Sequence, residues 1–319
     1  MPPAVLIVVG LLLLAAGGEL LVRGATAVAR QVGVTPAVIG LTIVAIGTSL
    51  PELVVSFLAA RAGQQDIAVG NIVGSNIFNI LGVLGITALI AVIPVEGTAV
   101  KVEWPFMFLA SCAVVVFARD GIIDRLEGGL MLAAYVVFTV FMIRLARQAV
   151  FGAEREAFER AIVGRTLWTT AAAAGLSVAA IVAGLALLGG GGRLLVTGAI
   201  DLARMAGLSE RVIGLTIVAV GTSTPEIAAS VVAALRGRTD VAVANVIGSN
   251  IFNILGILGG TALYRPLAVS AAMLNTDMVW MMVAALALFP ILRSGMQVAR
   301  SEGLLLLGSY AAYLILLLR

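Results

Sequence analysis

The chain has 319 residues, of which 61% are hydrophobic and 12% are charged. Soluble globular proteins average about 45–50% apolar and about 25% charged residues, so the composition excludes an ordinary soluble enzyme and predicts an α-helical membrane protein. The sequence contains no His and one Cys, which excludes imidazole metal sites, a Ser-His-Asp triad and internal disulfides. A net charge of +3 gives no indication of nucleic-acid binding.

Ten apolar stretches approach or exceed the roughly 20 residues that a membrane-spanning helix needs. In chain order they cover residues 3–29, 36–61, 67–93, 101–118, 127–146, 167–200, 209–235, 241–263, 273–292 and 302–318. The most polar stretch, 147–166, is predicted to be a linker between a first unit, 1–146, and a second unit, 167–319. Loops on the linker side carry 11 basic residues and loops on the side of the termini carry 7, so the linker is expected in the cytoplasm and both termini outside.

The two halves repeat each other at an offset of 174 residues, with 34 identities in the 52 positions that pair 39–90 with 213–264. Five spans in each half form an odd number, so the second copy crosses the membrane in the opposite direction. Inverted repeats of this kind characterise many secondary transporters. The predicted fold is therefore an all-α membrane protein with ten transmembrane helices in two five-helix repeats of inverted topology.

The most similar block of each half is Gly-Thr-Ser-x-Pro-Glu, at 47–52 and 221–226. Proline inside an apolar helix removes one backbone hydrogen bond and bends the helix. Thr48 and Glu52 are four residues apart and so share a helix face. A carboxylate at the bilayer centre costs at least ~3 kcal/mol, which implies that some interaction offsets this cost. Because the copies are inverted, Glu52 and Glu226 are expected to face each other near the midplane.

A second block, Gly-Ser-Asn-Ile-Phe-Asn, follows in each half. It forms a polar stripe with a spacing of four residues, in which the outer members, Asn71 and Asn245, are expected to serve helix packing. The inner members are expected to belong to the site, and they are Ser75, Asn79, Ser249 and Asn253. Carboxylate, hydroxyl, amide and carbonyl oxygens suit hard cations such as Ca²⁺ and Na⁺. Two glutamates supply a charge of −2, which one Ca²⁺, Na⁺ ions or protons can balance.

These paired blocks resemble the α-repeats of the sodium/calcium exchanger family, prokaryotic type, in the cation/calcium exchanger superfamily. The resemblance implies Na⁺/Ca²⁺ antiport by alternating access at a shared site in a prokaryotic plasma membrane, with the first and sixth helices sliding as a gating pair. The ligands that it implies are Ala45 (carbonyl), Thr48, Ser49, Glu52, Ser75, Asn79, Ala219 (carbonyl), Thr222, Ser223, Glu226, Ser249 and Asn253. Some members carry Asp where Asn253 stands, so the Na⁺:Ca²⁺ stoichiometry stays open.

Other functions remain to be distinguished from Na⁺/Ca²⁺ exchange. H⁺/Ca²⁺ antiport and K⁺-dependent Na⁺/Ca²⁺ antiport use the same carboxylates, and a passive cation channel is a more remote alternative. No enzymatic activity and no cofactor are expected, because Ser49 and Ser223 have no nearby base. A single chain carries both halves of the site, so a monomer is expected to suffice for transport. Glu19 and Arg23, four residues apart in the first helix, are expected to form an ion pair.

Overall fold

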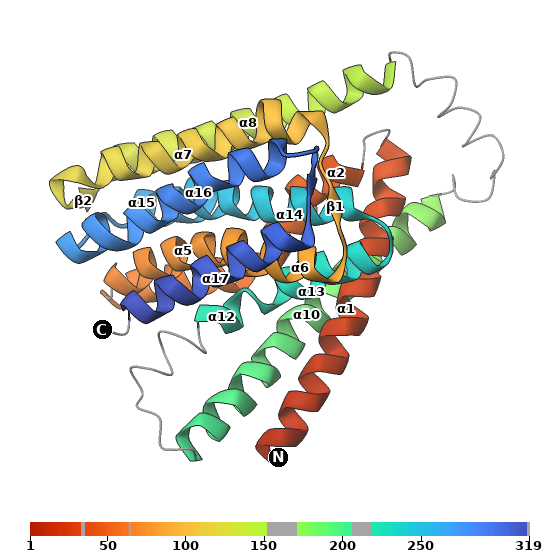
Figure 1. Cartoon of the computed structure of the whole chain (residues 1–319), viewed down its shortest axis with the longest axis horizontal. Coiled ribbons are helices and arrows are strands. Elements are labelled where there is room, and N and C mark those ends of the chain that lie inside the picture. The colour runs from red at the N-terminus through yellow and green to blue at the C-terminus, as the bar shows by residue number, and fades with distance from the viewer. Residues whose placement is uncertain (33–35, 64, 152–170, 206–218, 318–319) are drawn as a thin grey trace.

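The protein is a mostly helical membrane-type protein, shown as a computed structural model in Figure 1, which describes residues 1–32, 36–63, 65–151, 171–205 and 219–317. Within these ranges eight helical stretches are long and apolar enough to cross a bilayer. They are Pro3–Val28, Gln65–Ile90, Ala99–Asp120, Arg125–Leu145, Gly175–Leu195, Val241–Tyr264, Met273–Arg293 and Arg300–Leu317.

The first half of the chain contains helices that match the first five predicted spans. In chain order its elements are α1 (Pro3–Val32), α2 (Pro36–Ile39), the π-helical turn η1 (Gly40–Val44), α3 (Ala45–Thr48), α4 (Leu50–Arg61), α5 (Gln65–Phe78), the π-helical turn η2 (Asn79–Val83), α6 (Leu84–Ile90), β1 (Ile93–Pro94), the π-helical turn η3 (Ala99–Glu103), α7 (Trp104–Phe117), the 3₁₀ turn η4 (Ala118–Asp120), β2 (Ile122–Ile123) and α8 (Arg125–Phe151).

The second half repeats this order wherever the structure describes it. Its elements are α10 (Ala171–Met205), α12 (Ala219–Thr222), α13 (Thr224–Leu235), α14 (Thr239–Ile251), the π-helical turn η6 (Phe252–Leu258), α15 (Gly259–Tyr264), β3 (Leu267–Ala268), the π-helical turn η7 (Met273–Asp277), α16 (Met278–Arg293), β4 (Gln297–Val298) and α17 (Arg300–Leu317). The first residues of the predicted span 209–235 lie outside the described residues.

The bend predicted at Pro51 is confirmed. Segments Gly40–Thr48 and Leu50–Arg61 meet at 51°, and they form a ninth candidate span if they are counted together. The break falls on Ser49, whose φ of −85° and ψ of 11° leave the helical region. Pro51 then occupies the first turn of α4, where its missing N–H breaks no helical hydrogen bond. Ser223 repeats this geometry before α13, with φ −87° and ψ 11°.

Four two-residue strands lie at the ends of the long helices, an element that the prediction of an all-α protein omits. β1 pairs antiparallel with β4, and β2 pairs antiparallel with β3. Each pair therefore joins a strand of one half to a strand of the other half. Strands this short fall below the length at which alternation in the sequence identifies a strand.

Helices α1 and α10 lie against each other and run steeply across the other long helices (Figure 1). Glycines every seven residues line their contact, and a Cβ added at Gly10 would meet the carbonyl oxygen of Gly191 at 2.8 Å. Farther along, a Cβ at Gly17 would meet the carbonyl oxygen of Gly184 at 2.9 Å. Residue numbers rise on one helix as they fall on the other, so the helices are antiparallel. Only glycine permits backbones this close.

The last helix of the first half reaches into the segment predicted to be the linker. Helix α8 continues to Phe151, inside the segment 147–166 that the sequence analysis assigns to the linker. Residues 152–170, which contain the rest of that segment, lie outside the described residues. The main buried core is formed mostly by α5 to α7 and α14 to α16, with further residues from α4, α8 and α17.

Candidate cation site

Two buried carboxylates lie at the centre of the polar region. Glu52 is in the first turn of α4 and Glu226 is in the first turn of α13, and both are 0% exposed. The first turn of a helix favours negative charge, because its free N–H groups and the helix dipole are oriented toward it. The break at Ser49 or Ser223 starts a new helix and so places each carboxylate in such a turn.

Hydrogen bonds connect each carboxylate to the opposite half of the chain. The Ser49 hydroxyl donates to Oε1 of Glu226 at 2.8 Å, and the Ser223 hydroxyl donates to Oε1 of Glu52 at 2.9 Å. Ser75 contacts the same Glu52 oxygen at 3.4 Å and the Ser223 hydroxyl at 3.4 Å. These five side chains are buried and form one cluster, as the duplicated motifs predict.

The two threonines of the motifs also lie beside the carboxylates. The Thr48 side chain lies close to the carboxylate of Glu226, and the Thr222 side chain lies close to the carboxylate of Glu52. The Thr48 hydroxyl donates to the carbonyl of Val44 at 3.1 Å and lies 3.4 Å from the Ala45 carbonyl oxygen. The Ala45 carbonyl also accepts the Ser49 N–H at 3.1 Å. In the second half, the predicted ligand Ala219 is the first residue of α12, as Ala45 is the first residue of α3.

The inner members of the polar stripe are all buried. Asn79 begins the π-helical turn η2, and Asn253 lies in the π-helical turn η6. A π-helical turn inserts one residue into a helix and frequently occurs at functional sites. Asn79, Ser249 and Asn253 are each 0% exposed, and no hydrogen bond connects them to the two glutamates among the described residues.

The outer asparagines hold helices together, as predicted. Asn71 donates to the backbone carbonyl of Glu52 at 3.2 Å and to the Ser56 hydroxyl at 3.0 Å, which ties α5 to α4. Asn245 makes the equivalent bond in the second half, to the Ser230 hydroxyl at 3.0 Å. The oxygen of Asn245 also lies 3.4 Å from the Thr48 hydroxyl.

Two further buried asparagines, Asn76 and Asn250, are not among the predicted ligands. The Asn253 amide donates to Oδ1 of Asn76 at 3.2 Å. The amide nitrogens of Asn76 and Asn250 lie 3.8 and 3.6 Å from the sulfurs of Met281 and Met107, respectively. Both asparagines fall off the four-residue stripe, and their identity in the two repeats is the signal that marks them.

Several oxygens of the predicted ligands are fully buried and have no hydrogen-bond donor among the described residues. They are Oε2 of Glu52, Oε2 of Glu226, Oδ1 of Asn79, Oγ of Ser249 and Oδ1 of Asn253. Buried acceptors are normally satisfied, so a set of unsatisfied ones beside two carboxylates suits a cation. The carboxylates also repel each other, which a cation between them relieves. In the described parts of the chain no group of three or more His, Cys, Asp or Glu side chains could hold a metal, so the site has two acidic groups only.

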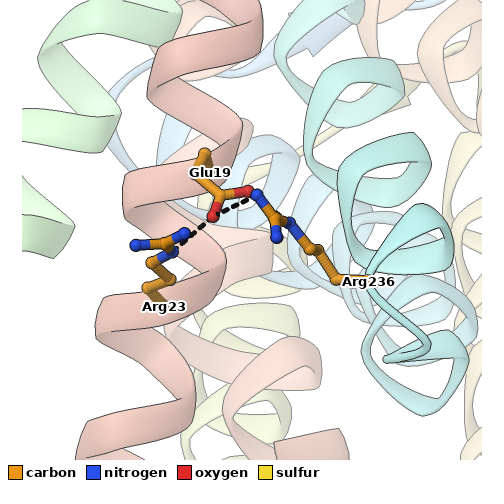
Figure 2. A network of polar contacts seen from close by, with 3 residues as sticks. All are labelled: Glu19, Arg23 and Arg236. Carbon is orange, nitrogen blue, oxygen red and sulfur yellow. Dashed lines mark hydrogen bonds and ion pairs between the residues drawn. The ribbon is translucent and has the colours of Figure 1, made fainter.

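A separate ion network links α1 to the second half near the surface (Figure 2). The predicted ion pair between Glu19 and Arg23 is confirmed. Arg236, which the sequence analysis does not assign to this pair, binds both oxygens of Glu19, with its Nε at 2.8 Å and its Nη2 at 2.7 Å. The three side chains line a shallow cavity of about 220 Å³ together with Val22, Thr26, Ala27 and Arg238.

The chain is similar to known proteins over nearly its whole length. The model of the sodium/calcium exchanger protein family matches residues 3–144 and 176–319. Over 316 residues the chain is 42% identical to the putative antiporter CaxA of Alkalimonas amylolytica, covering 98% of each protein. It is 37% identical to the inner membrane protein YrbG of Escherichia coli strain K12, covering 98% of this chain and 95% of that protein.

Among solved structures, the sodium-calcium exchanger NCX_Mj matches with a TM-score of 0.83 and 30% sequence identity, covering 99% of this chain and 98% of that chain. The likeness thus extends over the whole length in sequence and in structure. It includes both halves and therefore both carboxylate blocks. The chain belongs to the sodium/calcium exchanger family.

Proposed function

We propose that this protein is a secondary active antiporter that exchanges Na⁺ for Ca²⁺ across the membrane at one shared site. The observation that carries the proposal is the crossed pair of bonds from Ser49 to Glu226 and from Ser223 to Glu52, with the second oxygen of each carboxylate buried and unpartnered. Both halves thus contribute to one oxygen-lined cluster. The names of CaxA, an antiporter, and NCX_Mj, a sodium-calcium exchanger, support the same function.

The proposed ligands are the twelve oxygen donors of the duplicated motifs. A serine hydroxyl that donates its hydrogen to a carboxylate keeps its lone pairs for a cation, so Ser49 and Ser223 can serve both groups at once. The proposed set is Ala45, Thr48, Ser49, Glu52, Ser75 and Asn79 in the first half and Ala219, Thr222, Ser223, Glu226, Ser249 and Asn253 in the second half. Ca²⁺ takes about 6–8 oxygens, and twelve donors exceed one such shell.

Charge explains why one site supports exchange. Glu52 and Glu226 together carry −2 when ionised, and one Ca²⁺ or two Na⁺ neutralises that charge. An unneutralised pair of carboxylates is costly in a low-dielectric interior. The empty site therefore opposes the passage between outward and inward states, whereas the loaded site permits it. This difference couples the movement of one ion to the return of the other.

The proposed architecture is ten spans in two five-helix repeats of inverted topology. Two observations support it. β1 and β3 are repeat equivalents, yet β1 pairs with β4 and β3 pairs with β2, and β1 and β2 lie at opposite ends of α7. The equivalent ends of the two repeats then lie on opposite membrane faces. The antiparallel contact of the repeat-equivalent helices α1 and α10 also supports inverted topology.

The glycine contact between α1 and α10 also suits helices that move as a pair. Small residues let the two backbones pack closely, which holds α1 and α10 together as one unit. Toward the rest of the protein, a Cβ at Gly18 of α1 would lie 3.1 Å from the carbonyl oxygen of Ala228 in α13. We propose that α1 and α10 slide together across α13 and its equivalent α4, which opens the site to one face at a time.

We further propose that the protein lies in a prokaryotic plasma membrane, with segment 147–166 in the cytoplasm and both termini outside. The excess of basic residues in the loops on the linker side supports this orientation. The name of the relative YrbG places that protein in the inner membrane. One chain contains every proposed ligand, so a monomer suffices for transport.

The test is calcium-45 uptake into proteoliposomes loaded with Na⁺, with Na⁺, K⁺ or H⁺ gradients imposed one at a time. We expect uptake against a Ca²⁺ gradient that stops when the Na⁺ gradient is dissipated. Uptake that follows a pH gradient alone would establish H⁺/Ca²⁺ exchange instead, and a requirement for K⁺ would establish K⁺-dependent exchange. Flux that only runs down the Ca²⁺ gradient would establish a channel.

A further inference from the structure

The amide of Asn253 is held on one side and free on the other. Its nitrogen donates to Oδ1 of Asn76 at 3.2 Å, whereas its oxygen is buried and has no donor among the described residues. Asn76 follows Ser75 directly, and Ser75 contacts both Glu52 and Ser223. Asn253 itself lies in η6, which packs against α4, the helix that carries Glu52.

A primary amide can present either its oxygen or its nitrogen to a neighbour, and only the oxygen binds a cation. An NH₂ group that faces the ion would repel it. Something must therefore fix the orientation of the Asn253 amide if this side chain is to act as a ligand. Asn76 supplies the acceptor that holds the NH₂ group on the far side.

Asn76 is itself oriented by a methionine. Its Nδ2 lies 3.8 Å from the sulfur of Met281. A thioether has no hydrogen to donate and accepts only weakly, so the NH₂ group of Asn76 faces the sulfur and its oxygen faces Asn253. Both asparagines are fully enclosed, with exposures of 1% for Asn76 and 0% for Asn253. Solvent therefore cannot replace either contact.

The equivalent residues of the other repeat lack the decisive contact. The amide nitrogen of Asn250 lies 3.6 Å from the sulfur of Met107, as expected for the counterpart of Asn76 and Met281. However, Oδ1 of Asn250 and both amide atoms of Asn79 have no partner among the described residues. Asn250 thus shares the contact with a methionine sulfur, but it makes no hydrogen bond to Asn79.

We propose that Asn76 is a positioning residue that fixes the Asn253 amide with its oxygen toward the transported cation. The inference rests on the proposed function, because it assumes that Asn253 is a cation ligand. Asn76 does not touch the ion itself. It sets the affinity of the site through the side chain that does.

The test is Ca²⁺ binding to the purified protein in detergent, measured by isothermal titration calorimetry, with Asn76→Leu as the first variant. Leucine has a similar volume and removes the acceptor. Since a net hydrogen bond is worth about 1 kcal/mol, we expect the dissociation constant to rise about fivefold or more. Should the leucine variant not fold, as judged by its elution from a sizing column, Asn76→Ala removes the same acceptor.

A double-mutant cycle separates positioning from a general packing defect. In an Asn253→Ala background there is no amide to orient, so adding Asn76→Leu should change the dissociation constant by less than about twofold. A loss of equal size in both backgrounds would overturn the proposal. The matched control is Asn250→Leu, which removes the same amide–sulfur contact and should leave binding within about twofold of wild type. An equal loss in that control would also overturn it.

The outcome for the wild-type protein keeps this inference separate from the proposed function. If the wild type binds no Ca²⁺, the proposed exchange itself fails. If the wild type binds Ca²⁺ and Asn76→Leu binds it equally well, only the role of Asn76 fails.

Discussion

Replacing Glu52 with glutamine is the sharpest test of the carboxylate pair. The side chain is 0% exposed, and its Oε1 accepts from Ser223 at 2.9 Å and from Ser75 at 3.4 Å. Glutamine keeps an oxygen for these two donors and nearly the same volume. Glu52→Gln therefore changes the charge of the site from −2 to −1 with little change in packing.

The expected loss of affinity follows from Coulomb's law. At an effective dielectric constant of about 20, two unit charges 4 Å apart interact by about 4 kcal/mol, so a carboxylate and Ca²⁺ interact by about 8 kcal/mol. Dehydration of both groups cancels much of this energy. A remainder of about 3 kcal/mol still weakens Ca²⁺ binding more than 100-fold.

The stability of the protein should change in the opposite direction. An ionised carboxylate that is buried without a cation destabilises the folded state, and glutamine removes that penalty. In the absence of Ca²⁺ and Na⁺ we expect the unfolding temperature of Glu52→Gln to rise by about 2 °C, which corresponds to about 0.5–1 kcal/mol. Loss of transport together with a gain in stability distinguishes a ligand from a structural residue.

The assay is calcium-45 uptake into proteoliposomes under a Na⁺ gradient, combined with thermal unfolding in detergent. The matched control is Glu103→Gln, because Glu103 is also a buried acid, 3% exposed, and lies in a different span, Ala99–Asp120. We expect this control to transport at the wild-type rate. Wild-type uptake by Glu52→Gln, or equal inactivity of Glu103→Gln, would refute the assignment.

Three further predictions concern the site, the helix contact and the surface ion pair. Asn253→Asp adds a third acidic group and should change the charge moved per Ca²⁺, so an unchanged current on a supported membrane would contradict a role for this position. Gly17→Ala places a Cβ 2.9 Å from backbone atoms of α10 and should destabilise the protein by about 1–3 kcal/mol. Gly189→Ala, with nothing within 4 Å, is its control, and equal unfolding temperatures would show that α1 and α10 tolerate separation. Arg236→Ala breaks an ion pair in which the side chains of Arg236 and Glu19 are 55% and 23% exposed. Thermal unfolding should therefore show a decrease in the free energy of unfolding of less than about 1 kcal/mol, and this decrease should be smaller in high salt.

The duplicated motifs predict most of the site because each motif is local. Thr48 and Glu52 share a helix face, and Pro51 predicts the bend, so one repeat defines half of the cluster. The crossed bonds of Ser49 and Ser223 could not be predicted, because spacing within a repeat does not say which carboxylate a serine reaches. That information depends on how two distant segments pack.

The role of Asn76 could not be predicted for a related reason. A helix with 3.6 residues per turn places Asn71, Ser75 and Asn79 on one stripe and Asn76 beside it. Its partner Asn253 lies in the π-helical turn η6, and the residue inserted there rotates side chains away from the positions that a regular helix gives them. Only the three-dimensional packing brings Asn76 to the Asn253 amide of the other half.

The repeats are identical at the site but differ at the ends of their helices, and this difference bears on the two states of the exchanger. Glu19 and Arg236 correspond to Arg193 and Ala62 in the repeat alignment, so the ion pair of Figure 2 has no counterpart on the other side. In the proposed exchange cycle of two inverted repeats, the outward and inward states exchange the environments of the two halves. A pair that joins α1 to the connection after α13 at one face only then stabilises one state without an equal effect on the other. In the proposed mechanism the shared site sets which ions are exchanged, and such unequal contacts set which state the protein occupies at rest.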